Sequence, residues 1–332
     1  MRVVICEFID DGAAASLAAR FEVVYDPVLG ERAPELHRAI ALADALIVRN
    51  RTTVDAALLA AAPRLKVVGR LGVGLDNIDL AACAARGIEV IAATGANARS
   101  VAEYVIATAL MLRRDVYRAS AAVAAGEWPR AALSRGHELA GSALGIVGFG
   151  SIGRLLAALS RALEVRVLAF DNAIGPQAPA WADCGAVFRP LDDLLREADI
   201  VSLHVPLAPD TRRLIDARRL ALMKPDAILV NVARGAIVDE HALYRHLIAH
   251  PRFCAGIDAW WHEPKPRSPF RSDLPFLELP NVLGSPHNSA VVPGVLLGAA
   301  RKAAQNVRQY LRGERVTGVM RSSDYQRSPG RP

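Results

Sequence analysis

A glycine-rich segment, Leu144-Gly-Ile-Val-Gly-Phe-Gly-Ser-Ile-Gly-Arg154, has the residue types needed to bind the diphosphate of a nucleotide. Gly148, Gly150 and Gly153 form a GxGxxG pattern between an apolar run and the helix-compatible run Leu155–Leu163. One glycine permits a tight turn, another lets the backbone approach a pyrophosphate, and the third lets the helix pack on the strand. The helix N-terminus adds unpaired N–H groups and partial positive charge. With these flanks the pattern predicts a dinucleotide site, the alternative being a plain glycine-rich turn.

The next apolar run ends in Asp171, 18 residues after Gly153. A carboxylate at this point can accept hydrogen bonds from both hydroxyls of an adenosine ribose, and it would repel a 2′-phosphate. Neither Asn172 nor Ala173 supplies an arginine for that phosphate. The segment therefore predicts NAD rather than NADP, the alternative being a solvated aspartate.

Four polar or charged residues follow other apolar runs of the second half. Arg234 follows Val230-Asn-Val-Ala, Asp258 and then Glu263 follow Gly256-Ile, and His287 follows Ser285-Pro. The carboxyl ends of strands line the ligand crevice of an open α/β sheet, so these side chains could converge. Spacing alone leaves other roles open: Arg234 could close a turn, His287 could cap a helix or be solvated, and Glu263 could be an ordinary exposed carboxylate.

The elements that would position these residues alternate between short β-branched runs and Ala/Leu-rich helical stretches. Such alternation, with strands of four to five apolar residues, predicts a parallel sheet covered on both faces. In the first part the predicted strands are Val3–Cys6, Glu22–Tyr25, Ala45–Val48, Lys66–Gly69 and Ile88–Ile91. In the second part they are Leu144–Phe149, Val165–Phe170, Asp199–Val205, Ala227–Val232, Cys254–Ala259 and Asn281–Pro286.

A long helix at Val101–Ala125, with Ser100 as N-cap and Glu103 completing a capping box, separates the two series. A last helix is predicted at about Pro293–Arg312, and the residues from 316 to 332 are predicted to be disordered. The pattern therefore predicts an α/β protein of two doubly wound lobes.

Composition excludes several classes of protein. With 52% hydrophobic and 22% charged residues in 332, the chain is not disordered and has room for two domains. A net charge of +6 over this length is a weak field, so we expect no nucleic-acid partner. We expect no membrane span and no signal peptide, because long apolar runs are missing and Glu7 comes early. Four widely spaced cysteines predict a reduced, cytoplasmic protein without a metal site.

Several ordered segments resemble the NAD-dependent D-2-hydroxyacid dehydrogenases, in their phosphoglycerate-dehydrogenase-like branch. The resemblance runs from about Val3 to Tyr310. Besides GIVGFGSIGR and SPH (Ser285–His287), the matching segments are VVGRLGVGLDNIDL (Val67–Leu80), ATGANARSVAEYVI (Ala93–Ile106), HVPLAPDTRRLID (His204–Asp216) and NVARGAIVDEHAL (Asn231–Leu243).

The resemblance implies the catalytic roles. Arg234 would bind the α-carboxylate or the reacting oxygen, for which a planar guanidinium is suited. His287 would be the general acid/base that protonates the carbonyl oxygen as hydride arrives at C2. Glu263 would orient the imidazole and favour its protonated form.

It also implies the domains and the cofactor contacts. A Rossmann NAD-binding domain, residues 97–286, would be inserted in a flavodoxin-like substrate domain made of residues 1–96 and 287–315. Asp258 would contact the nicotinamide end of NAD. The other implied cofactor contacts are Gly148, Gly150, Ser151, Ile152, Gly153, Asp171, His204, Pro206, Thr211, Val232 and Ala233. Family members exchange arms around the Val101–Ala125 helix, so a homodimer is expected, with intramolecular burial of this apolar helix as the alternative.

The implied substrate is a small 2-hydroxy or 2-oxo acid. The backbone amides of Val73 and Gly74 would bind its carboxylate as an anion nest, and Arg49, Arg70 and Asn97 would complete the substrate site. Arg49, Arg70 and the additional Arg51 follow two strands of the first lobe, which favours a second anionic group as in 3-phosphoglycerate or sulfolactate. Only 45 residues follow His287, so a serine-binding regulatory domain is not expected. Trp260 and Trp261 could narrow the pocket or simply pack.

Three other functions stay open at this point. The chain could be a glyoxylate or hydroxypyruvate reductase, or a formate or phosphite dehydrogenase, which would have less use for Arg49 and Arg51. It could also be an NAD(H)-sensing binding protein, like the corepressors that share this fold.

Overall fold

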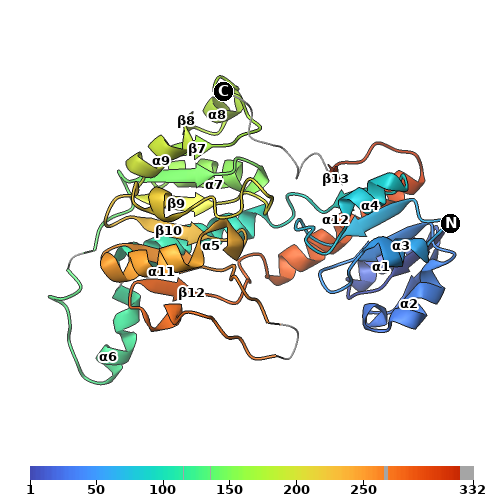
Figure 1. The fold of residues 1–332 in the computed structure, drawn as a ribbon, viewed down its shortest axis with the longest axis horizontal. Helices are drawn as coiled ribbons and strands as arrows, with labels where there is room; N and C mark the ends of the chain where they lie inside the picture. Colours follow the sequence, from blue (N-terminus) through green and yellow to red (C-terminus); the bar gives the residue numbers. More distant parts are fainter. Residues whose placement is uncertain (115, 135, 265–267, 322–332) are drawn as a thin grey trace. The chain divides into compact units, whose positions relative to one another are not determined.

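The computed structural model describes residues 1–114, 116–134, 136–264 and 268–321. The chain divides into two compact units. The first is formed by Met1–Asn97 together with residues 291–321, and the second by Ala98–Ala290. Each unit has a sheet that is wholly or mainly parallel, with helices on both faces (Figure 1). The prediction of an α/β fold with two doubly wound lobes is therefore confirmed.

The sheet of the first unit has the strand order β13-β5-β4-β3-β1-β2. Its members are β1 (Arg2–Ile5), β2 (Glu22–Tyr25), β3 (Ala45–Val48), β4 (Val67–Arg70), β5 (Glu89–Ala92) and β13 (Val319–Met320). The first five run parallel in the order 2-1-3-4-5, which is the order of flavodoxin-like folds. β3 and β4 are buried along their whole length, β3 being entirely apolar and β4 ending in the buried Arg70.

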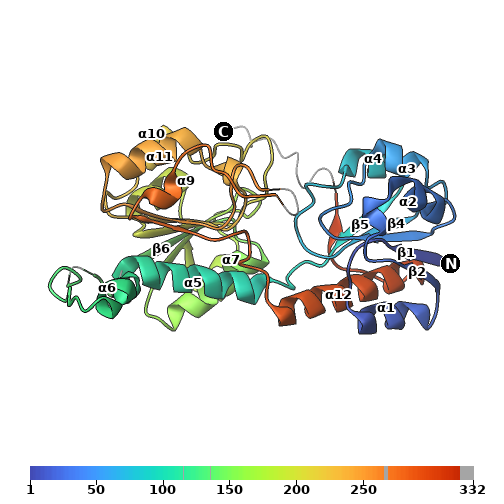
Figure 2. The same ribbon diagram turned by 90° about the horizontal axis from the view of Figure 1, so that it is seen from below.

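Side chains of these strands alternate between two apolar layers. Val3 and Ile5 pack in one layer with α1 and α12, whereas Val4 packs in the other with α2, α3 and α4 (Figure 2). The helices are α1 (Asp11–Ala18), α2 (Ala33–Ile40), α3 (Ala56–Ala60), α4 (Leu80–Ala85) and α12 (Pro293–Leu311). Gly69 permits the close approach of α12, because a Cβ there would lie 2.6 Å from Cγ2 of Val307.

The second unit holds a fully parallel sheet in the order β12-β11-β10-β9-β6-β7-β8. Its strands are β6 (Ala143–Val147), β7 (Arg166–Phe170), β8 (Ala186–Phe188), β9 (Ile200–Leu203), β10 (Ile228–Asn231), β11 (Cys254–Ile257) and β12 (Val282–Gly284). Read from β8, this is the 3-2-1-4-5-6 order of dinucleotide-binding folds, extended by one strand. The order reverses between β6 and β9, which is where such folds bind their ligand.

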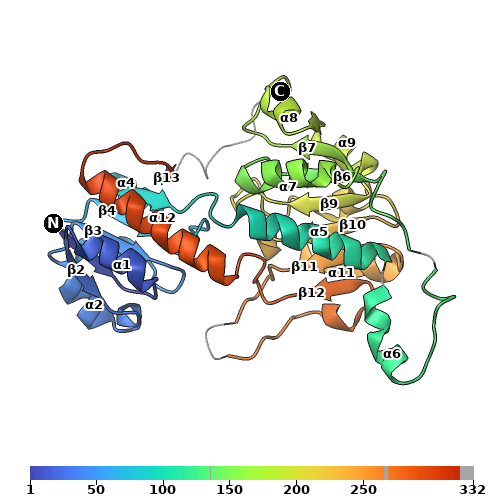
Figure 3. The same ribbon diagram turned by 180° about the vertical axis from the view of Figure 1, so that it is seen from behind.

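Two helix layers cover this sheet. α5 and α7 cross one face (Figure 3), and residues of α8 share their apolar layer. Residues of α9, α10 and α11 form the layer on the opposite face. The helices of these layers are α5 (Ala98–Arg114), α7 (Ser151–Arg161), α8 (Ala180–Asp183), α9 (Leu191–Glu197), α10 (Ala217–Leu220) and α11 (Glu240–Ala249). Helix α6 (Ser120–Ala124) buries no residue and belongs to neither layer. Short 3-10 turns occupy Leu29–Glu31, Val116–Ala119, Gly235–Ile237 and Phe276–Glu278.

The structure corrects three predictions of secondary structure. The predicted helix Val101–Ala125 is two helices, α5 and α6, and α5 begins at Ala98, so Ser100 is not its N-cap. Val319 and Met320 form a short antiparallel strand on β5, so the prediction of disorder is wrong for these two residues. β8 was not predicted at all. The residues from 322 onward lie outside the described part of the chain.

In the described ranges, no helix has both the length and the apolar composition that a membrane crossing requires. The four cysteines are free thiols.

Candidate active site

Neighbouring strands of the second unit bring the predicted catalytic residues together. β10, β11 and β12 are adjacent and parallel, so their carboxyl ends lie side by side. Arg234 lies three residues after β10, Asp258 directly follows β11, and His287 lies three residues after β12. The convergence that spacing alone left open is therefore present within this unit.

His287 and Glu263 form a hydrogen-bonded pair. Nδ1 of His287 lies 2.7 Å from Oε1 of Glu263, which also accepts a hydrogen bond from the backbone N–H of Trp260 at 3.3 Å. The two side chains are 35% and 41% exposed, so a ligand can reach the pair. With Nδ1 bound to the carboxylate, Nε2 is the ring nitrogen left to exchange a proton with a ligand.

The pair shifts both titrations in the direction that keeps it charged. The hydrogen bond that His287 donates to Glu263 raises the pKa of His287, against the opposing effect of burial. Burial alone would raise the pKa of Glu263, but the hydrogen bond and the charge of His287 outweigh it, so the pKa of Glu263 is lowered. This arrangement favours a protonated imidazole next to an ionised carboxylate.

Arg234 lies close enough to act electrostatically on both members of the pair, and its positive charge lowers the pKa of Glu263 and of His287. Its Nη1 donates a hydrogen bond to the carbonyl oxygen of Ala233 at 2.6 Å. A guanidinium and a protonated imidazole side by side form a site for a small anion.

Asp258 is completely buried and binds the segment that carries His287. Its Oδ1 accepts hydrogen bonds from Ser285 Oγ (2.6 Å) and from the backbone N–H of Asn288 (2.9 Å). Its Oδ2 accepts from the backbone N–H of Ser289 at 3.0 Å, and its carbonyl oxygen accepts from the N–H of His287 at 2.9 Å. The resemblance implies a contact between Asp258 and the nicotinamide end of NAD, and both carboxylate oxygens of this residue are engaged with residues 285–289.

The glycine-rich turn has the backbone geometry that a bound pyrophosphate requires. Gly148 has φ of 99°, and a Cβ there would lie 2.8 Å from the carbonyl carbon of His204. A Cβ on Gly153 would lie 2.4 Å from the oxygen of Gly148, whereas a Cβ on Gly150 would meet no described heavy atom within 4 Å. Two glycines therefore close the turn, and the third leaves open space at the N-terminus of α7, so the turn fits a dinucleotide. Ser151 and Ile152 form the first turn of that helix.

Asp171 lies at the end of β7, beside the glycine-rich turn. Its Oδ2 accepts a hydrogen bond from Phe149 N–H and its Oδ1 accepts one from Ala173 N–H, both at 2.8 Å. A carboxylate offers about four lone-pair sites, so two remain for a ribose diol.

The remaining cofactor candidates lie after β9 and β10. Burial lowers the pKa of His204 to about 3, so its imidazole is neutral, and Ser202 Oγ lies 2.9 Å from its Nε2. Thr211 donates to the carbonyl oxygen of Pro206 at 2.6 Å and thereby closes a turn between them. Val232 and Ala233 are buried next to Arg234.

In the first unit, the arginines are held in different ways. Arg49 is half-buried and lines an apolar cavity of about 260 Å³ with Phe8 and Leu296. Arg51 is exposed and pairs with Glu31 at 3.0 Å. Arg70 is buried, and it donates to the carbonyl oxygens of Gly74 and Leu71 at 2.9 and 2.8 Å. Arg70 therefore shapes the glycine loop that contains Val73.

The side chains of Asn97, Trp260 and Trp261 are buried or packed against neighbouring residues. Oδ1 of Asn97 is buried and accepts no hydrogen bond from the described residues. Trp260 donates through Nε1 to Ser285 O, and Trp261 donates to Val238 O, both at 2.8 Å. Both rings pack near Phe276, so the packing alternative describes them better than a contact with substrate.

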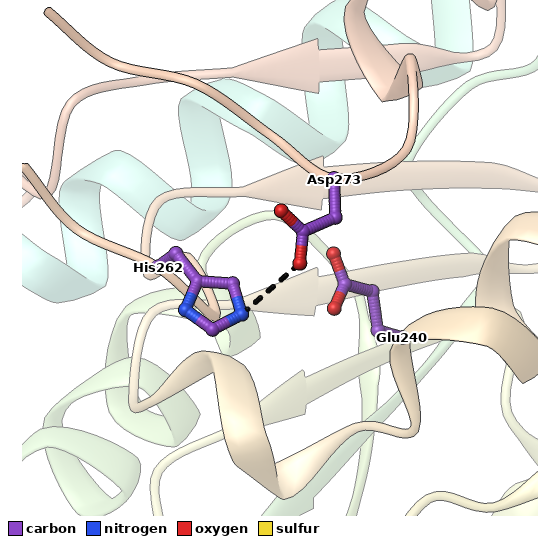
Figure 4. Close-up of side chains that lie close together, drawn as sticks. All are labelled: Glu240, His262 and Asp273. Atoms are coloured by element: carbon purple, nitrogen blue, oxygen red, sulfur yellow. Dashed lines mark ion pairs between the residues drawn. The ribbon is translucent and has the colours of Figure 1, made fainter.

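A second polar cluster lies next to the catalytic pair in sequence. Glu240, His262 and Asp273 bring their ligand atoms within 4.8 Å of one another, and His262 Nε2 lies 3.2 Å from Asp273 Oδ2 (Figure 4). Burial and the charge of Asp273 raise the pKa of Glu240. His262 and Asp273 are both 66% exposed. We interpret the cluster as a surface ion pair beside a carboxylate.

Comparison with known proteins places these features in a family. Residues 106–289 match the family described as "D-isomer specific 2-hydroxyacid dehydrogenase, NAD binding domain". An (S)-sulfolactate dehydrogenase of Chromohalobacter salexigens is 46% identical over 86% of this chain and 93% of its own length. A D-3-phosphoglycerate dehydrogenase of Mycobacterium leprae is 40% identical over 95% of this chain, which spans only 57% of that relative. The crystal structure of a glyoxylate reductase from Paecilomyes thermophila superposes with a TM-score of 0.85 at 26% identity, covering 96% of this chain and 98% of the other.

Proposed function

The chain belongs to the NAD-dependent D-isomer specific 2-hydroxyacid dehydrogenases, and we propose that it interconverts a 2-hydroxy acid and its 2-oxo acid at the His287–Glu263–Arg234 site. The observation that carries the proposal is the 2.7 Å contact between His287 Nδ1 and Glu263, next to the charge of Arg234. A histidine paired with a carboxylate can act as a general acid/base, and the neighbouring arginine can bind an anionic substrate.

The proton chemistry follows from the charge state of the pair. In the reducing direction, protonated His287 donates through Nε2 to the carbonyl oxygen, while Glu263 stabilises the cation until the proton leaves. Arg234 binds the carboxylate or the reacting oxygen and disperses its developing negative charge. In the oxidising direction, neutral His287 accepts the hydroxyl proton. NAD(H), when bound, accepts or supplies the hydride at C2.

We assign the cofactor to the second unit. Gly150 and the N-terminus of α7 would bind the pyrophosphate, and Asp171 would bind the adenosine ribose. His204, Pro206, Thr211, Val232 and Ala233 would form the remainder of the contact surface. Asp171 disfavours a 2′-phosphate, so we propose NAD(H) in preference to NADP(H).

For the substrate we propose an acid with a second anionic group, of the sulfolactate or 3-phosphoglycerate type. Support comes from Arg49, from the amides of Val73 and Gly74, and from the identity shared with the sulfolactate and phosphoglycerate dehydrogenases. Asn97, with its unused buried oxygen, is a further candidate for binding the substrate.

A glyoxylate or hydroxypyruvate reductase is the second candidate, and a specific observation favours it. Arg51 is paired with Glu31, and Arg70 is bound to its own loop, so two of the three arginines have partners within the chain. A pocket with fewer available cations would suit a substrate with one carboxylate.

The deciding experiment follows NADH oxidation at 340 nm with sulfopyruvate, phosphohydroxypyruvate, oxaloacetate, hydroxypyruvate and glyoxylate. Turnover confined to the first three would support the doubly anionic substrate, and preference for the last two would support the second candidate. His287→Gln should abolish turnover while NADH still binds, and NADPH should be a poor substitute. NADH binding without turnover on any 2-oxo acid would refute the enzymatic proposal and favour an NAD(H) sensor.

We also propose that the protein is a cytoplasmic homodimer. Large apolar side chains are exposed around α6: Tyr117, Val123 and Trp128 are 68%, 47% and 77% exposed. Several large apolar side chains exposed on one segment are typical of interfaces. Light scattering coupled to size exclusion should give twice the 35.5 kDa chain mass for the wild type, and Trp128→Glu should shift the mass toward the monomer.

A further inference from the structure

We propose that Tyr104, on helix α5, is a positioning residue that holds His287 in its working orientation through Ser285 and Asp258. The inference rests on the proposed function, because it concerns the general acid/base of that reaction. Tyr104 has no catalytic role in the assignment above. The positioning role is inferred from a series of connected, short hydrogen bonds inside the second unit.

The chain of hydrogen bonds has a defined direction. The hydroxyl of Ser285 donates to Oδ1 of Asp258 at 2.6 Å. Ser285 has only one hydroxyl hydrogen, so its 2.5 Å contact with Tyr104 must be donated by the tyrosine. The order is therefore Tyr104 OH to Ser285 Oγ to Asp258. Burial raises the pKa of Tyr104, so this donor keeps its proton through the neutral range.

Asp258 passes this constraint to His287. Its carbonyl oxygen binds the N–H of His287, and its carboxylate binds the N–H groups of the two following residues. Oxygen atoms of one buried residue thus bind both sides of the catalytic histidine. His287 needs that support, because its φ of 51° lies in the left-handed region that non-glycine residues rarely adopt.

A second bond joins the same helix to the same segment. Ser100 Oγ donates to the carbonyl oxygen of Ser289 at 2.7 Å. Ser100 and Tyr104 are four residues apart, so they share one face of α5. This face is anchored by buried neighbours, including Val101 and Val105, in the core of the unit. A rigid helix therefore holds residues 285–289 at two points, on either side of His287.

The distance between His287 and Glu263 depends on that placement. Three charged groups act on the imidazole: Glu263 and Asp258 raise its pKa, and Arg234 lowers it. If the segment shifts, the 2.7 Å contact with Glu263 lengthens first, and the pKa of His287 falls toward its ordinary value. Proton donation then fails at a lower pH than in the wild type.

The test compares Tyr104→Phe, Ser285→Ala and the double variant with the wild type, all as full-length protein. Tyr310→Phe, in α12 of the first unit, is the matched control, because it removes the same hydroxyl from a half-buried side chain. The measurements are kcat and KM for reduction against pH, the NADH Kd by fluorescence, and the thermal midpoint. The pKa of His287 is measured separately by NMR on protein labelled at histidine Cε1, with His287→Gln assigning its signal among the eight histidines.

We expect Tyr104→Phe to lower kcat about tenfold, with the NADH Kd unchanged and the alkaline fall of the rate moved to lower pH. The pKa of His287 should move the same way in the NMR titration. Because Tyr104 and Ser285 act through the same series of hydrogen bonds, the double variant should be no slower than the more impaired single variant. Tyr310→Phe should match the wild type.

Unchanged kcat and unchanged titration of His287 in Tyr104→Phe would overturn the proposal. So would additive losses in the double variant, or a loss explained by a large fall in thermal midpoint in both single variants. If the wild type turns over no 2-oxo acid, the proposed function fails, but the NMR titration still decides whether Tyr104 positions His287.

Discussion

Replacing Glu263 by glutamine should have opposite effects on the pH dependence of the rate of reduction and on that of the rate of oxidation. Glutamine keeps the shape and an oxygen acceptor for His287 Nδ1, but it removes the negative charge 2.7 Å away. The wild-type carboxylate raises the pKa of His287, so its removal disfavours the protonated imidazole. Reduction requires that protonated form, and oxidation requires the neutral one.

The size of the effect follows from the exposure of the pair. A hydrogen bond between charged groups contributes about 1.5–3 kcal/mol when well shielded. The two side chains are 35% and 41% exposed, so screening leaves about 1 kcal/mol. That energy corresponds to about a fivefold smaller protonated fraction wherever His287 is mostly neutral. At a pH well below the pKa of His287 in both the wild type and the variant, the protonated fraction of His287 is unchanged.

The assay is kcat/KM for reduction and for oxidation between pH 5 and pH 9. For reduction, Glu263→Gln should lose about fivefold more activity at the alkaline end than at the acid end. For oxidation, which requires neutral His287, the variant should keep about fivefold more activity relative to the wild type at the acid end than at the alkaline end, so that the acid limb extends to lower pH. Glu278→Gln, which alters an exposed carboxylate of the same unit, should leave both profiles unchanged. Profiles of Glu263→Gln that parallel the wild type at every pH would refute the electrostatic reasoning.

Three further predictions concern the cofactor site and stability. Gly148→Ala should lower the free energy of unfolding by about 1–3 kcal/mol in a thermal-shift assay, because φ is 99° and the added Cβ would touch the backbone of His204. Gly150→Ala should fold normally, but fluorescence titration should show NADH binding weakened about tenfold. Asp171→Asn should reduce the preference for NADH over NADPH about tenfold in the ratio of their Kd values, and an unchanged ratio would remove Asp171 from the ribose site. Hydrogen bonds from Arg218 lower the pKa of Asp192 to about 2, so this carboxylate stabilises the fold above the unfolded pKa of about 4 and loses that effect as pH falls toward 2. Asp192→Asn should therefore cost about 1 kcal/mol in urea unfolding at pH 7 and about half as much at pH 3, whereas an equal cost at both would contradict the ion-pair assignment.

The strands that carry the site were predictable because their signal is local. β6 and β11 are continuous apolar runs and β10 is one up to its last residue, Asn231; the polar residues at their ends mark the carboxyl edge of the sheet. The family motifs added the proposed roles of Arg234, Glu263 and His287. The hydrogen bond between His287 and Glu263 joins residues 24 apart in sequence, and only the strand order of the folded unit brings them together.

Other features depend on contacts that sequence patterns do not contain. β13 is two residues long and exists because Val319 pairs with Ile91 across the chain. Ser100 has the residue type of an N-cap, but its hydroxyl is used on Ser289 inside α5, where the tertiary contact prevails over the local preference. Tyr104 gave no signal beyond its place on an apolar helix, since its partner Ser285 is 181 residues away.

The pairing of β13 with β5 means that the first unit can be completed only at the end of synthesis. The second unit is one continuous stretch, Ala98–Ala290, and all of its strands are available once that stretch has left the ribosome. The first unit is completed last, because α12 and β13 cover a sheet whose other strands were made before the second unit began. Until then, the apolar layer formed by Val3 and Ile5 lacks its α12 cover, and the edge of β5 is unpaired. The nascent chain thus exposes an apolar sheet face and a free strand edge for the time needed to translate about two hundred residues, which makes this unit the natural client for chaperones.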